Sequence, residues 1–66
     1  MKVSVTFEYA QRAPETWRGD FATSLPSNGA RLGLKAARAA IKPRGWSSAV
    51  ILLERGDQAT SEATEA

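Results

Sequence analysis

The chain has 66 residues, a net charge of +2, and neither cysteine nor histidine. It is long enough for one small domain, and the missing residue types exclude disulfides, thiolate nucleophiles, the commonest zinc ligands and the usual general base. Its longest apolar run, Ala49 to Leu53, is too short to span a membrane, and no apolar signal segment opens the chain, so we expect a soluble cytoplasmic protein without metal or cofactor.

Two strands are predicted at the start of the chain. Residues 2–10 alternate strictly between polar and apolar side chains, the apolar ones being Val3, Val5, Phe7 and Tyr9. A period of two is typical of a half-buried strand. A connection containing Pro14 follows, and residues 16–24 alternate again around Trp17 and Phe21. We interpret the two segments as a hairpin.

A helix is predicted next. Residues 25–29 have the small and polar character of a turn, and Ser27 is expected to cap the helix by accepting a backbone N–H. The helix should run from about Asn28 to Lys42, because Pro43 stops it and Gly45 lies just beyond.

Residues 46–55 are rich in apolar and β-branched side chains and too short for a second stable helix, so they predict a third strand. A crossover through the helix would place this strand parallel to the second, with the first between them. The expected fold is therefore α+β: a small single-layer ββαβ unit over 1–55, with a three-stranded sheet in the order 2-1-3 and one helix on one face. Residues 56–66 are polar and acidic, and we expect them to form a flexible tail.

A short repeat also occurs, RGDFATS at 18–24 and RGDQATS at 55–61. No other residues match at this offset, so a duplicated structural unit is excluded. An adhesion motif would need an exposed loop on a secreted protein, and short motifs often match by accident. We interpret the repeat as chance similarity.

The charge distribution is the strongest anomaly of the sequence. Residues 1–55 hold all nine Lys and Arg against four acidic residues, a balance of +5, whereas 56–66 hold three acidic residues and no cation. No acidic residue occurs between Phe21 and Leu53. At 100° per residue, four cations of the helix fall within an arc of roughly 60°. They are Arg31, Lys35, Arg38 and Lys42, and Arg44 follows just beyond the helix.

Two interpretations of this basic stripe stay open. Any amphipathic helix has a charged face toward solvent. However, the neighbouring pairs along this stripe are all like-charged, and a one-sided basic stripe is typical of phosphate binding. A nucleic acid or an acidic protein surface is therefore a candidate partner for the stripe.

The third strand carries more apolar side chains than one helix can cover. Trp46, Val50 and Leu52 alternate with Ala49, Ile51 and Leu53. If the second row lies on the open face of the sheet, Ile51 and Leu53 form a protein interface, in a homodimer or with another protein. The alternative is that the twist of the strand or the tail covers this row.

Catalysis has no support in the pattern, because no nucleophile has a base beside it and the carboxylates are scattered. The aromatic side chains could stack on single-stranded nucleic acid, but at strand spacing they are better explained as core. We therefore expect a non-enzymatic module that contacts nucleic-acid phosphates. In general architecture the basic ββαβ unit with a polar tail resembles small accessory proteins of phages and plasmids, including some anti-CRISPR proteins. That resemblance implies a protein-binding inhibitor or adaptor as one alternative, and a purely structural domain is another.

Overall fold

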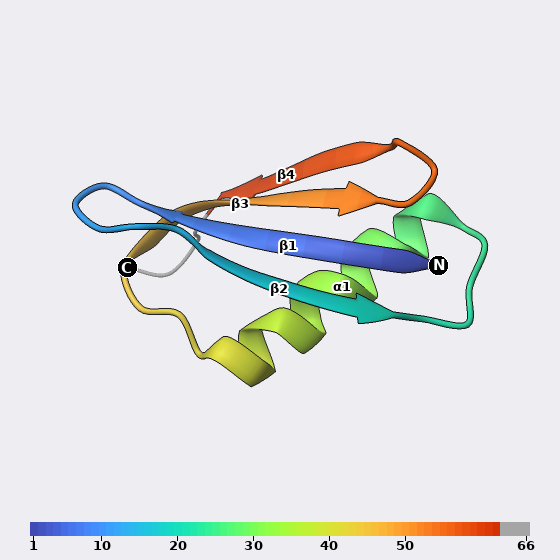
Figure 1. Cartoon of the computed structure of the whole chain (residues 1–66), viewed down its shortest axis with the longest axis horizontal. Helices are drawn as coiled ribbons and strands as arrows, with labels where there is room; N and C mark the ends of the chain where they lie inside the picture. Colours follow the sequence, from blue (N-terminus) through green and yellow to red (C-terminus); the bar gives the residue numbers. More distant parts are fainter. Residues whose placement is uncertain (63–66) are drawn as a thin grey trace.

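The computed structural model describes residues 1–62, which form one antiparallel sheet with a helix on one face (Figure 1). The elements are β1 (Lys2–Tyr9), β2 (Glu15–Asp20), α1 (Pro26–Ile41), β3 (Trp46–Leu53) and β4 (Gln58–Glu62). The strand order is β2-β1-β3-β4, and α1 contacts β1, β2 and β3. The α+β class, the single covering helix and the order 2-1-3 are thus confirmed, and a fourth strand is added. Within residues 1–62, no helix has the length and apolar character needed to cross a bilayer.

β1 is one of the two inner strands, and its side chains alternate between the two faces of the sheet. Val3, Val5 and Phe7 are buried beneath α1, whereas Lys2 and Glu8 are exposed on the other side, which we call the open face. β1 pairs antiparallel with both β2 and β3, so these two strands run parallel to each other, as predicted.

The third strand contains a bulge that changes which of its side chains face the core. Ser48 pairs with Glu8, but the next pair is Trp46 with Tyr9, so Ser47 is an extra residue in β3. An inserted residue shifts the alternation by one position. Trp46 is consequently buried on the same side as the rest of the core, rather than facing outward with Val50 and Leu52.

The apolar row that we expected on the open face is therefore the covered one. Ile51 and Leu53 are only 3% and 6% exposed, and they pack in the core. Leu52 is 47% exposed and Val50 is half-buried on the open face. The prediction that Ile51 and Leu53 form an exposed interface was wrong. The helix covers their row because it continues the buried row of β1, where Val5 pairs directly with Ile51.

The fourth strand comes from residues that we expected in a flexible tail. Gln58–Glu62 pairs antiparallel with β3, from Gln58 opposite Leu52 to Glu62 opposite Ser48. The connecting turn contains Gly56, with φ of 92°, whose N–H donates to the carbonyl of Leu53 at 2.9 Å. Backbone pairing along the edge of β3 needs no large side chain. The tail prediction was wrong for 58–62, and residues 63–66 lie outside the described part of the chain.

The helix begins earlier than predicted and has no side-chain cap at its start. Leu25 is the N-cap residue and Pro26 occupies the first turn, where its missing N–H is not needed. Ser27 therefore lies inside the helix, and its predicted capping role was wrong. At the other end, Lys42 adopts the left-handed conformation and donates its N–H to the carbonyl of Arg38 at 2.9 Å. Pro43 then prevents the helix from continuing.

The helix face that meets the sheet carries small residues. Its buried residues are Gly29, Gly33 and Ala37, spaced one turn apart. Ala30, Leu34 and Ile41 are partly buried at the margin of the core. The small residues allow α1 to lie close to the sheet, which leaves the opposite side of the helix in solvent.

Candidate nucleic-acid interface

The five cations of the predicted basic stripe line one concave groove of about 640 Å³ on the side of α1 away from the sheet. The groove is completed by Leu34, Ala39 and Pro43. No carboxylate lies among the residues that line it in the described part of the chain. The predicted set, which the structure brings together, consists of Arg31, Lys35, Arg38, Lys42 and Arg44.

The end of α1 gives the groove its shape. Lys42 adopts φ 54° and ψ 56°, a left-handed conformation that turns the chain sharply after the helix. Pro43 and Arg44 consequently lie beside the last turns of α1 and form the far wall of the groove. The C-terminal end of a helix carries partial negative charge, which favours the cations gathered there.

Arg38 connects the groove to the core. Its guanidinium carbon lies 5.9 Å from the centroid of the Trp46 ring, within the range of a cation–π interaction. Trp46 in turn packs edge-to-face on Phe7, with ring centroids 5.3 Å apart. A cation in the middle of the groove is thereby held against a buried aromatic pair, which limits its rotamers.

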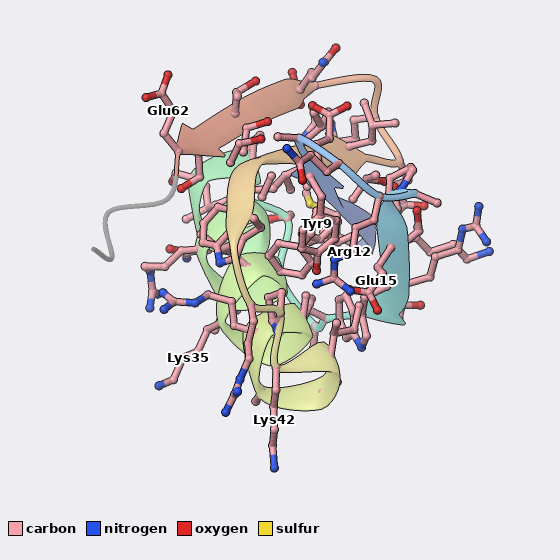
Figure 2. The ribbon with its side chains drawn as sticks, turned by 90° about the vertical axis from the view of Figure 1, so that its left-hand side faces the viewer. Tyr9, Arg12, Glu15, Lys35, Lys42 and Glu62 are labelled. Atoms are coloured by element: carbon pink, nitrogen blue, oxygen red, sulfur yellow. The ribbon has the colours of Figure 1, made fainter. Side chains whose placement is uncertain are left out.

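The carboxylates Glu8, Glu62 and Asp20 lie on the open face of the sheet. Glu8 and Glu62 lie at open-face positions flanking Ser48, and Ser48 donates its hydroxyl to Glu8 at 3.0 Å. Asp20 lies at the opposite end of that face and is 3.0 Å from the α-amino group of Met1. Figure 2 shows Glu62 on the sheet side, while Lys35 and Lys42 project from the helix in the opposite direction. Lys2 and Arg18 also lie on the open face, so that face carries charges of both signs, whereas the lining of the groove carries cations alone.

A second cluster, which sequence reasoning missed, lies in the loop between β1 and β2. The Arg12 guanidinium carbon lies 3.7 Å from the centroid of the Tyr9 ring, and the Tyr9 hydroxyl donates to the carboxylate of Glu15 (Figure 2). Arg12 also donates from Nη2 to the backbone carbonyl of Arg44 at 3.0 Å. Tyr9, Arg12 and Arg44 line a second depression of about 420 Å³ together with Ala10, Gln11 and Gly45.

The environment of Tyr9 changes its titration. Desolvation by burial raises the pKa of the Tyr9 hydroxyl, and the hydrogen bond to Glu15 and the charge of that carboxylate act in the same direction. The positive charge of Arg12 opposes them. The hydroxyl therefore remains a hydrogen-bond donor to Glu15 at neutral and moderately alkaline pH.

The open face of the sheet has its own depression of about 490 Å³, and Leu52 is its exposed apolar member. The charged residues around it are Lys2, Arg18, Asp20 and Glu54. We predicted an exposed apolar surface on the correct strand, β3, but on the side chains of the opposite face. Leu52 therefore takes the place of Ile51 and Leu53 as the candidate contact for a protein partner.

The aromatic side chains are divided between the core and its margins. Phe7 and Trp46 are buried, while Trp17 and Phe21 are partly buried with ring centroids 6.0 Å apart. None of the residues that line the basic groove is aromatic. Among residues 1–62, no three acidic side chains gather closely enough to hold a metal ion. No family model, curated protein or solved structure matches this chain.

Proposed function

We propose that this protein is a small non-enzymatic binding module that holds nucleic-acid phosphates in the basic groove beside α1. The observation that carries the proposal is the groove itself: five cationic side chains line one concave surface, and none of the residues lining it is acidic. Such a one-sided basic surface is the electrostatic footprint of polyanion binding.

The arrangement is unfavourable for the isolated protein. Arg31 and Lys35 are one helical turn apart, and two further neighbouring pairs along the stripe are also like-charged. Each such pair destabilises a helix by about 0.2–0.5 kcal/mol. A surface that serves only solubility mixes charges of both signs. Bound phosphates would neutralise this repulsion, and counterions released from the nucleic acid would add a favourable, salt-dependent contribution.

The residues of the groove favour binding without sequence preference. Lys and Arg contact phosphates and so fix position and orientation, but contacts to phosphates carry no sequence information. Base stacking is supported by aromatic side chains, and the groove lining contains none. We therefore expect the affinity of non-specific binding, with Kd of about 10⁻⁴ to 10⁻⁶ M at physiological salt.

A second candidate function is docking of a protein partner through the open face of the sheet. Leu52 favours it, because it is 47% exposed and lies within a depression of the open face. An apolar side chain surrounded by charged ones matches the anatomy of a protein contact, which has an apolar centre and a polar rim. Such docking would resist salt and would not depend on the basic groove.

Titration of the purified protein with short duplex and single-stranded DNA and RNA, at low and near-physiological salt, tests the first proposal. We expect binding that weakens steeply as salt rises, because each neutralised phosphate of a duplex contributes a slope of about −0.9 in log K against log salt. Absence of binding at low salt would contradict nucleic-acid binding. The remaining functions would then be binding of a protein partner or a purely structural role.

A further inference from the structure

Two depressions on the helix side of the molecule share one residue. Arg44 lines both the basic groove and the depression beside the β1–β2 loop. Arg12 lines the second depression and donates a hydrogen bond to the Arg44 carbonyl at 3.0 Å. The cationic surface therefore continues past the end of α1 to a loop that is 32 residues away in sequence.

Arg12 is held in a fixed position on this surface although it is exposed. Its guanidinium stacks 3.7 Å from the centroid of the Tyr9 ring, and the Tyr9 hydroxyl is tied to Glu15. A guanidinium has five N–H donors, and the bond to the Arg44 carbonyl uses Nη2. A cation positioned before binding loses less side-chain entropy when a ligand arrives.

The length of this surface exceeds the size of an isolated phosphate. From Arg31 to Lys42 the helix rises about 16 Å at 1.5 Å per residue. One strand of a duplex carries a phosphate every 3.4 Å along the axis, so this row alone faces about five phosphates. Arg44 and Arg12 lengthen the row beyond the helix end.

We infer that the site takes an extended phosphodiester chain rather than a single phosphate group, and that Arg12 contacts the chain beyond the end of α1. The inference rests on the proposed function and deepens it. Arg12 is a binding residue in this assignment, and Tyr9 is a positioning residue that acts through it.

The test compares salt dependence across variants, using hairpin duplexes of increasing length, matched single strands and inorganic phosphate as probes. The duplex and single-strand arms decide which form of the phosphodiester chain is preferred. Arg12→Gln is expected to lower the slope of log K against log salt by about 0.9 on a duplex. Arg18→Gln is the matched control, because it removes the same charge from the open face, and its slope should equal that of the wild type.

Further variants separate a contact with the ligand from a structural role. Arg12→Lys keeps the charge but loses the planar guanidinium, so its slope should stay near that of the wild type while its affinity falls. Affinity per site should rise with duplex length and level off once the row is covered, and inorganic phosphate should compete only weakly.

The outcomes also distinguish the contact of Arg12 with the phosphodiester chain from nucleic-acid binding in the basic groove itself. If the wild type binds no oligonucleotide, both fail. If it binds and loses binding on substitution of the helix cations, while Arg12→Gln keeps the wild-type slope, the groove stands and the extension is wrong. A lower melting temperature for Arg12→Gln with an unchanged slope would assign Arg12 a structural role alone.

Discussion

Gly33 of α1 lies so close to Val3 of β1 that a Cβ added to the glycine would stand 2.5 Å from Val3 Cγ1. Val3 is 2% exposed and β-branched, so it has little freedom to move aside. The contact fixes the height of α1 above the sheet. Because the basic groove lies on the other side of the same helix, this packing also sets where the cations are held.

We expect Gly33→Ala to destabilise the protein, because the clash with Val3 falls on a stiff core side chain. Overpacking costs about 1–3 kcal/mol and exceeds the gain of up to about 1 kcal/mol in helix propensity. Gly29→Ala is the matched control: its Cβ would meet the Met1 sulfur at 2.6 Å, and a flexible side chain can rotate away. Chemical denaturation measures both, and equal stabilities of the two variants would contradict the close approach at Gly33.

Lys42→Gly should separate stability from binding. Lys42 has φ of 54°, a conformation that costs a non-glycine residue about 1 kcal/mol, so glycine should raise or preserve the melting temperature. The same substitution removes one cation from the groove and should lower the slope of log K against log salt by about 0.9. Lys35→Ala is the control, since it removes a charge at an ordinary helical position. Loss of stability in Lys42→Gly would contradict the left-handed helix end.

The raised pKa of Tyr9 predicts a loss of stability in alkali. The unfolded chain releases the tyrosine proton near pH 10, whereas the folded chain retains it to higher pH. The unfolded state then binds fewer protons, so the free energy of unfolding falls as the pH rises from about 10 through the folded pKa. Tyr9 is the only tyrosine, so its ionisation can be followed by absorbance. Tyr9→Phe should lack this component, and an identical alkaline profile in both proteins would refute the shift.

Leu52 and Ile51 are neighbours in β3, but their substitution by Glu should affect folding very differently. Leu52 is 47% exposed, so a carboxylate there remains hydrated and the melting temperature should change little. Ile51 is 3% exposed, and burying an unpaired carboxylate there costs several kcal/mol, which should unfold much of the protein. Thermal melting followed by circular dichroism measures the stability of both variants. Similar melting curves would mean that β3 presents its faces differently.

The sequence correctly predicted those elements that follow from the periodic order of side chains along the chain. The alternation of β1 from Val3 to Phe7 and the arc of cations on α1 both follow from regular periods of two and 3.6 residues. Pro43 marked the helix end to within two residues. These features depend only on near neighbours in the chain.

Features that depend on distant partners could not be predicted in the same way. β4 contains no large apolar side chain and forms because its backbone pairs with the edge of β3. The bulge at Ser47 is visible only in the pairing of β3 with β1, and it reverses the side on which Trp46 lies. Arg12 joins the basic surface because a loop folds against Arg44, and no periodic pattern links these two residues.

The most direct test of the basic groove compares two triple variants with the same net charge. One removes the groove cations Arg31, Lys35 and Lys42 by substitution to Gln, leaving Arg38 in place because it packs on Trp46. The other substitutes Gln for three cations elsewhere on the surface, Lys2, Arg18 and Arg55.

With a short duplex, the groove variant should show a salt slope lower by roughly 2.7 and much weaker binding at low salt, while the other variant keeps the wild-type slope. Equal slopes for the two triple variants would mean that binding follows net charge alone and that the groove is not the site.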